Sequence, residues 1–199
     1  MITVPASQVQ ELRQRTGVGM MECKRALEEA EGDIDRAVDL LRLKGQAKAA
    51  KKAGRVANEG RVESYIHLGG KIGVLIEIDC ETDFVAKTDD FRDLARTLAM
   101  QVAATSPLAV RREDIDPQVV EREAAIYRQQ AAESGKPAEI VEKIAHGRLD
   151  KWYQEVCLLE QAFVKDPDRK VSDVVTEAVQ RLGENLVVRR FVRFEVGGE

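Results

Sequence analysis

The sequence contains few of the residues that carry covalent or metal chemistry. Only three cysteines and two histidines occur among 199 residues. Cys23, Cys80 and Cys157 are widely separated, so no pair has the spacing of zinc ligands and no disulfide framework is indicated. His67 and His146 leave few candidates for a histidine-based catalytic set. We therefore expect reduced thiols, no cofactor, no metal site and no enzyme, while a disulfide between two copies of the chain stays an open alternative.

Motifs for nucleotide binding and hydrolysis are also missing. The chain has no Gly-x-x-x-x-Gly-Lys-Ser/Thr loop, no Gly-x-Gly-x-x-Gly after a strand, no Gly-x-Ser-x-Gly elbow and no His-Glu-x-x-His pair. The net charge of -4 offers no overall attraction for nucleic acid, so we expect no DNA partner. No apolar run approaches the roughly 20 residues that span a bilayer, and the N-terminus lacks a signal-peptide pattern. These features predict a cytoplasmic protein with no membrane partner.

The composition is that of a folded, helix-rich protein, with 44% apolar and 33% charged residues. Residues 1–54 are predicted to form a module of three short helices. Ser7 and Gln10 form a capping-box pattern for the first helix, which residues 16–19 interrupt. A second helix is expected over about residues 20–30, and Asp33 caps a third that ends at Gly45. So small a core favours an interaction module over an enzyme.

Two methionines open the second predicted helix. If one of Met20 and Met21 faces the small core, the other is exposed, where a flexible thioether suits a partner-binding surface. The alternative that both are partly buried stays open.

A basic segment without acidic residues follows. Its cations are Lys44, Lys48, Lys51, Lys52 and Arg55. They could form an RNA-binding stripe, but no aromatic residue lies between them to stack on bases. The intervening alanines favour a helical or semi-rigid linker that ends at Gly54. We predict a linker between an N-terminal domain, residues 1–54, and a core and dimerisation domain, residues 55–199.

The core domain carries three strand patterns. Apolar and polar residues alternate over residues 62–68 and 72–80, with a turn at Gly69 and Gly70, and again over residues 186–196. These segments predict a three-stranded antiparallel sheet. On the second strand, Glu77 and Asp79 are expected on the solvated face, opposite the isoleucines.

Helical patterns surround these strands. Helices are predicted to begin at the caps Thr88, Asp116 and Ser172, and Pro137 opens the second arm of a helical hairpin. Residues 161–170 are expected to be a loop. The predicted fold class is therefore α+β: a three-helix module, a linker, and a three-stranded antiparallel sheet packed with helices and a helical hairpin.

Residues 82–91 join the best strand pattern to the best helix pattern. A short loop between two rigid elements can present Asp83 and Phe84 outward with little entropy left to lose on binding. Spacing alone favours another interpretation, in which Phe84 and Val85 belong to the core and Asp83 is a turn residue.

A series of motifs spans nearly the whole chain. They are Glu11-Leu12-Arg13-x-Arg15-Thr16-Gly17-x-Gly19-Met20-Met21-x-Cys23-Lys24, Gly32-Asp33-Ile34, Lys48-Ala49-Ala50-Lys51-Lys52-Ala53-Gly54, Thr82-Asp83-Phe84-Val85-Ala86-Lys87, Gly135-Lys136-Pro137 and Phe191-Val192-Arg193-Phe194-Glu195-Val196. In this order they resemble bacterial translation elongation factor Ts. The resemblance implies a ubiquitin-associated-like fold for residues 1–54. It also implies a guanine-nucleotide exchange factor that binds the GDP form of the GTPase elongation factor Tu, displaces Mg²⁺ and promotes GDP release during translation elongation.

The resemblance assigns contact residues as well. In the family, the Asp-Phe of the Thr-Asp-Phe-Val loop intrudes near the magnesium and phosphate site of the GTPase. The matching residues are Thr82, Asp83, Phe84 and Val85, with Asp83 and Phe84 at the tip. Further contacts are implied in the N-terminal module and in the hairpin: Arg13, Met20, Met21 and His67.

Longer family members carry the core subdomain twice, with the loop in one copy and the histidine hairpin in the other. This chain holds both in a single copy, so we expect a homodimer that forms a two-plus-two complex with elongation factor Tu. The closing strand, which is apolar on both faces, agrees with this expectation. The competing interpretations are an RNA-associated or ubiquitin-like scaffold and, less favoured, an enzyme that uses the acidic residues around residue 83.

Overall fold

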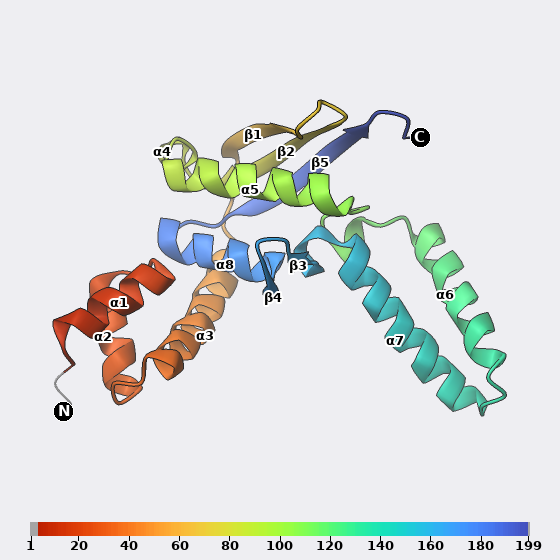
Figure 1. Ribbon diagram of the computed structural model, residues 1–199, viewed down its shortest axis with the longest axis horizontal. Coiled ribbons are helices and arrows are strands. Elements are labelled where there is room, and N and C mark those ends of the chain that lie inside the picture. Colours follow the sequence, from red (N-terminus) through yellow and green to blue (C-terminus); the bar gives the residue numbers. More distant parts are fainter. Residues whose placement is uncertain (1–3, 199) are drawn as a thin grey trace. The chain divides into compact units, whose positions relative to one another are not determined.

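The computed structural model describes residues 4–198 (Figure 1). Residues 1–3, which belong to the segment examined for a signal peptide, and residue 199 lie outside this range. The chain forms two compact units. The first comprises Met1–Arg61, Asp79–Leu94 and Asp173–Val187, and the second Val62–Ile78, Ala95–Ser172 and Val188–Glu199. The domain division at residues 54 and 55 stays a prediction.

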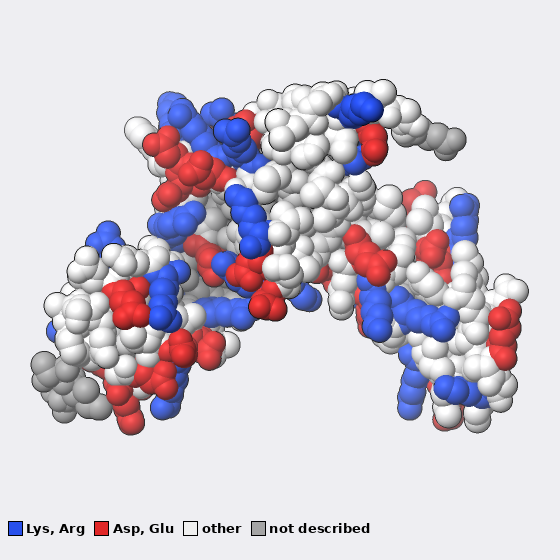
Figure 2. Space-filling model, in the orientation of Figure 1, with Lys and Arg blue, Asp and Glu red and all other residues white. Residues whose placement is uncertain are grey.

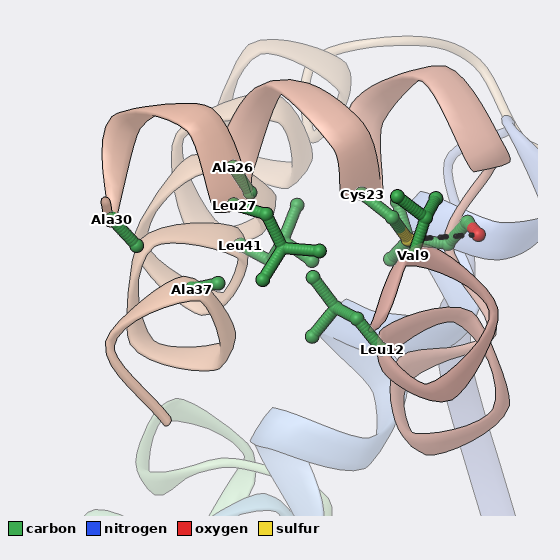
Figure 3. Close-up of a cluster of buried hydrophobic side chains, with 9 residues drawn as sticks. Val9, Leu12, Cys23, Ala26, Leu27, Ala30, Ala37 and Leu41 are labelled. Carbon is green, nitrogen blue, oxygen red and sulfur yellow. Dashed lines mark hydrogen bonds between the residues drawn. The ribbon is translucent and has the colours of Figure 1, made fainter. Parts of the chain in front are cut away.

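The first unit begins with the predicted three helices: α1 (Ala6–Thr16), α2 (Met20–Glu29) and α3 (Ile34–Lys52). Their apolar faces enclose a small core, drawn in Figure 3, that includes Leu12, Cys23, Leu27 and Leu41. Two expected helix ends are confirmed. Gly17 ends α1 with φ of 67°, a left-handed conformation that glycine adopts without strain, and the Asp33 side chain accepts a hydrogen bond from the N–H of Arg36 at the start of α3.

Two other helix ends differ from the prediction. The capping box of Ser7 and Gln10 is wrong, because α1 begins one residue before Ser7 and Pro5, with φ of -63°, holds the N-cap position without a side-chain cap. Gly45 does not end α3, which continues to Lys52. A Cβ at Gly45 would collide with the side chain of Gln180, so this glycine permits close packing between α3 and α8 (Val171–Leu182).

Most of the three-stranded antiparallel sheet lies in the second unit, and its prediction is confirmed. Strands β1 (Glu59–Ile66), β2 (Ile72–Cys80) and β5 (Val187–Glu195) follow the order β1-β2-β5, so β2 is central. Helix α5 (Asp89–Thr105) runs along one face of the sheet (Figure 1). The Thr88 hydroxyl accepts a hydrogen bond from the N–H of Phe91, as expected of an N-cap. The buried face of α5 is the predicted one: Phe91, Leu94, Ala95, Leu98, Ala99, Val102 and Ala103.

The expectation for Asp79 is wrong. Glu77 is partly exposed, whereas Asp79 is only 8% exposed. Near its end, β2 is covered on both faces, since Ile78, Asp79 and Cys80 are all buried. The acidic residues of this strand therefore do not form one solvated row.

The remainder of the second unit contains the predicted helical hairpin. Helices α6 (Pro117–Ala132) and α7 (Ala138–Val156) pack together, with the Asp116 side chain capping α6. Short 3-10 turns lie before α6 (η1, Arg112–Asp114) and after α7 (η2, Leu158–Glu160). No helix within residues 4–198 is long and apolar enough to cross a membrane.

The prediction of a loop over residues 161–170 is wrong. These residues contain a small hairpin of β3 (Ala162–Phe163) and β4 (Asp166–Lys170). The buried amide of Gln101 stabilises it, because its nitrogen donates to the carbonyl of Ala162 and its oxygen accepts from the N–H of Val164. Helix α8 begins at Val171, one residue before the predicted cap Ser172.

Candidate functional site

The family motif at residues 82–87 folds into a single helical turn, α4 (Asp83–Ala86), and not into an extended loop. The side chains of this turn differ strongly in burial. Ala86 is buried, whereas Phe84 is 79% exposed. Phe84 is therefore not a core residue, and the interpretation that spacing alone favoured is wrong for this residue. A large apolar side chain held this far into solvent is available to a partner.

The acidic residue beside Phe84 is engaged within the turn. Asp83 Oδ2 accepts a charge-assisted hydrogen bond from Lys87 Nζ at 2.6 Å. This bond, together with the negative charge of Asp83, raises the pKa of the Lys87 ammonium. The side chains of both residues are about half exposed or more, at 49% for Asp83 and 70% for Lys87, so solvent screens the pair and a partner can separate it.

Both ends of α4 are held by hydrogen bonds to side chains. At its start, the Glu184 carboxylate accepts bonds from the N–H groups of Glu81 and Thr82, each at 3.0 Å, and from the Thr82 hydroxyl at 2.6 Å. At its end, the Thr88 hydroxyl donates to the carbonyl of Val85 at 2.7 Å. Sequence reasoning missed Glu184, since it lies about a hundred positions from Thr82 and no local pattern marks it.

The predicted contacts of the N-terminal module lie on its surface. Arg13 is exposed. Met20 and Met21 are 41% and 62% exposed and neither belongs to the small core, so the arrangement with one of them in the core is not the one formed. Cys23, on the same helix, is fully buried and belongs to the small core. Both methionines carry flexible thioethers of the kind that suit a partner-binding surface, and we call these two exposed side chains the methionine surface.

His67 lies at the predicted place, at the tip of the hairpin between β1 and β2 in the second unit. The backbone N–H of His67 donates to the carbonyl of Ile72, and the ring Nδ1 of His67 lies 3.0 Å from the Tyr65 hydroxyl. The imidazole is exposed and oriented by Tyr65. It is thus presented to solvent, where a partner could meet it.

The face of the sheet opposite α5 is apolar and open. The ion pair of Glu77 with Arg190, and the closeness of Ile66 to Gly73, identify the side chains that share this face. We call it the outer sheet face and define it by six large exposed residues: Val62, Ile66, Leu75, Val192, Phe194 and Val196. A sheet face with this many large exposed apolar side chains is typical of an interface.

The basic segment is largely neutralised by ion pairs and hydrogen bonds. Lys44 pairs with Glu29, and Lys48 with Glu22. Lys52 donates to the carbonyl of Gly183, and Arg55 pairs with Glu81. Figure 2 likewise shows both signs of charge interspersed over the N-terminal helices on the face in view. These pairs weaken the interpretation of the segment as an RNA-binding stripe.

The cysteines and acidic groups offer little for other chemistry. All three cysteines are buried, and burial raises the pKa of the Cys80 and Cys157 thiols to about 11. A disulfide between two copies would therefore require a buried thiol to become exposed. Within residues 4–198 no group of three or more His, Cys, Asp and Glu side chains is arranged to hold a metal ion.

Comparison with known proteins finds one family. The family model described as "Elongation factor TS" matches residues 34–198, which include α4, the outer sheet face and Glu184. Elongation factor Ts of Carboxydothermus hydrogenoformans is 60% identical over 194 residues, 98% of this chain and 89% of the relative. The proteins of the same name from Moorella thermoacetica and Caldanaerobacter subterraneus subsp. tengcongensis are 60% and 55% identical over 98% of this chain, covering 96% and 97% of their own lengths.

Proposed function

Because the chain belongs to the elongation factor Ts family, we propose that it is the guanine-nucleotide exchange factor for elongation factor Tu. It binds the GDP form of this GTPase and promotes GDP release during translation elongation, in the cytoplasm and without covalent chemistry. The observation that carries the proposal is the 79% exposed Phe84 on α4, within the motif that the sequence shares with the family.

The proposed mechanism is displacement of Mg²⁺ on the partner. Asp83 brings a carboxylate and Phe84 an aromatic ring to the region where the GTPase holds magnesium and phosphate. There the carboxylate and the ring would shift the ligands of the metal and the loops beside the phosphates. Burying a phenylalanine side chain is worth about 1.5–3 kcal/mol. Since about 1.4 kcal/mol is a factor of ten in affinity, the ring alone supplies enough free energy to weaken GDP binding at least tenfold.

The exposed methionines supply binding free energy for the displacement. Met20 and Met21, with Arg13 nearby in the sequence, dock on the nucleotide domain of the GTPase, and their binding free energy offsets the strain that α4 imposes. By thermodynamic linkage, GDP weakens the factor's binding by the same ratio as the factor weakens that of GDP. Exchange is therefore reversible, and its direction follows the nucleotide concentrations.

We further propose that two copies of the chain associate through their outer sheet faces. The six large apolar residues of this face are exposed in one copy, and a second copy offers a matching apolar surface. A dimer supplies two α4 turns and two copies of His67, so that one subunit can present α4 and the other His67 to each GTPase. The expected assembly is a two-plus-two complex with elongation factor Tu.

The release of fluorescent GDP from elongation factor Tu tests the function. We expect that mixing with an excess of the chain accelerates release strongly over buffer. Leu108→Ala is a suitable control, since Leu108 is also exposed and apolar but lies outside the proposed surfaces. It should accelerate release as the unaltered chain does. If the unaltered chain leaves the rate unchanged, the proposed function is wrong.

A further inference from the structure

The start of α4 is fastened by one carboxylate from a distant part of the chain. Glu184 follows α8, and its Oε2 accepts both the Glu81 and the Thr82 N–H groups. Its Oε1 accepts the Thr82 hydroxyl. Thr82 holds the N-cap position of α4, yet its side chain makes no cap hydrogen bond to the turn. Its hydroxyl instead donates to Oε1 of Glu184 at 2.6 Å. Glu184 therefore binds the start of α4 where a side-chain cap would otherwise be expected.

The same two segments are also joined in the opposite direction. The Glu81 carboxylate accepts the N–H of Asn185 at 2.7 Å and faces Arg55 at 3.4 Å. The Asn185 side chain, buried at 5% exposure, donates to the carbonyl of Arg55 at 2.9 Å. The N–H of Asn185, and after it the Arg55 guanidinium, lower the pKa of the Glu81 carboxyl. Reciprocal bonds of this kind leave the end of β2 little freedom to shift.

Phe84 has little else to fix its direction. Helix α4 is four residues long, one turn, and a single turn is not stable by itself in water. The exposed ring gains little from packing in the free protein. Its orientation therefore depends on what holds the turn. These supports are the bonds to Glu184 and Thr88 at its two ends, the Cys80 thiol, which donates to the Thr82 carbonyl at 3.1 Å, and the burial of Ala86. A turn that is ordered before binding loses less conformational entropy when it meets a partner.

We propose that Glu184 is a positioning residue for exchange, which holds α4 so that Asp83 and Phe84 reach the magnesium and phosphate region of the GTPase. This inference rests on the proposed exchange function. Glu184 itself makes no contact with the nucleotide or the metal. It acts through the backbone of Glu81 and Thr82. Loss of Glu184 should therefore lower the rate of GDP release from the bound complex more than the affinity of the factor for the GTPase.

The test compares Glu184→Gln and Glu184→Ala with the unaltered chain. Gln is nearly isosteric and keeps the fold testable should Ala unfold. Glu121→Gln, at an exposed position of α6, is the matched control for the loss of one negative charge. For each chain, the GDP release rate is measured against factor concentration, and amide hydrogen exchange is followed in the factor alone.

We expect the maximal release rate to fall about tenfold for Glu184→Ala and less for Glu184→Gln, because charge-assisted hydrogen bonds are lost. The concentration for half-maximal rate should stay within about twofold, since the methionine surface is intact. In the free factor, the amides of Glu81 and Thr82 should exchange faster, while those of α6 do not. The Glu121→Gln control should match the unaltered chain in all three measurements.

Two results overturn the positioning role: an unchanged maximal rate, or a rise in the half-maximal concentration as large as the fall in rate, which indicates general loss of structure. If the unaltered chain itself fails to accelerate release, the exchange function is wrong and the role assigned to Glu184 falls with it. Hydrogen exchange distinguishes this failure from an error about the bonds to Glu184. If those bonds do not hold the start of α4, the amides of Glu81 and Thr82 exchange equally fast in the Glu184 variants and in the unaltered chain.

Discussion

The α4 turn and the outer sheet face both expose large apolar side chains, but they do so in different ways. On α4, one aromatic ring stands among charged neighbours such as Asp83 and Lys87. The outer sheet face presents five apolar residues on its strands and Val196 directly after β5, together with the ion pair of Glu77 and Arg190. A small surface with a polar surround suits a partner that binds and leaves, whereas a broad apolar face suits permanent association.

The difference also lies in how each surface is supported. The outer sheet face is rigid because β2 pairs with strands on both sides. The α4 turn depends on individual side-chain hydrogen bonds to Glu184 and Thr88. A substitution on the sheet should therefore change assembly, and one at α4 should change activity.

The largest effect is expected for Phe194→Glu on the outer sheet face. Phe194 is 67% exposed in one copy, so the variant should fold, but a dimer would have to bury an unpaired charge. We expect the dissociation constant of the dimer to rise at least about a hundredfold. Analytical ultracentrifugation at micromolar concentration should show monomer for the variant and dimer for the unaltered chain. A monomer in both cases refutes the proposed dimer.

The next effect is expected for Phe84→Ala on α4. Loss of the ring should reduce the maximal GDP release rate about tenfold or more, because its burial in the partner is lost. Stopped-flow fluorescence gives the rate, with Leu108→Ala as the control. Sedimentation and thermal unfolding should match the unaltered chain. An unchanged rate would show that α4 is not the acting element.

A cluster of charged residues lies outside both surfaces. A substitution there should change the stability of the fold without changing assembly or GDP release. Arg112 Nη2 donates to Glu160 at 2.7 Å, its Nη1 donates to Asp150, and its guanidinium stacks over Tyr153. The Arg112 hydrogen bond lowers the pKa of Glu160. A depressed carboxyl pKa contributes stability that is present above the unfolded value, near 4.3, and is lost as pH falls through the folded value.

We therefore expect Glu160→Gln to lower the free energy of unfolding by about 1–2 kcal/mol at pH 7. The difference from the unaltered chain should shrink as pH falls below about 4.3. Urea unfolding at several pH values gives both quantities. Dimer formation and the maximal release rate should be unaffected under native conditions. An equal difference at pH 7 and at pH 3 would contradict the assigned role of the Arg112 pair.

The smallest effect is expected for Met21→Ala. Met21 is 62% exposed, so its truncation should hardly change stability. If the methionine surface only docks the partner, the half-maximal concentration should rise about twofold to fivefold at an unchanged maximal rate. Concentration series of GDP release measure both. A fall in maximal rate instead would mean that docking and displacement are not separate tasks.

Local patterns predicted most of the fold. The alternation over residues 72–80 identified β2, the apolar spacing after Thr88 identified α5, and the caps Asp33, Thr88 and Asp116 were correct because each acts within a few residues. The errors at Gly45 and Asp79 concern contacts between distant segments. Gly45 packs against Gln180, and β2 is covered at Asp79, neither of which local spacing reveals.

The candidate site was predicted only in part, because it too depends on contacts between distant segments. The motif at residues 82–87 was found through the family resemblance, but its helical conformation and the exposure of Phe84 required the structure. Glu184 was missed because its partners Glu81 and Thr82 lie about a hundred positions earlier. A glutamate between a helix and a strand has no distinguishing local pattern.

The most direct test of the account is the acceleration of GDP release from elongation factor Tu, measured with Mg²⁺ present and after its removal by EDTA. If α4 acts by displacing the metal, the unaltered chain should accelerate release strongly with Mg²⁺ and far less without it. Phe84→Ala should differ from it chiefly with Mg²⁺ present. No acceleration with Mg²⁺, or the same acceleration with and without it, would contradict the account.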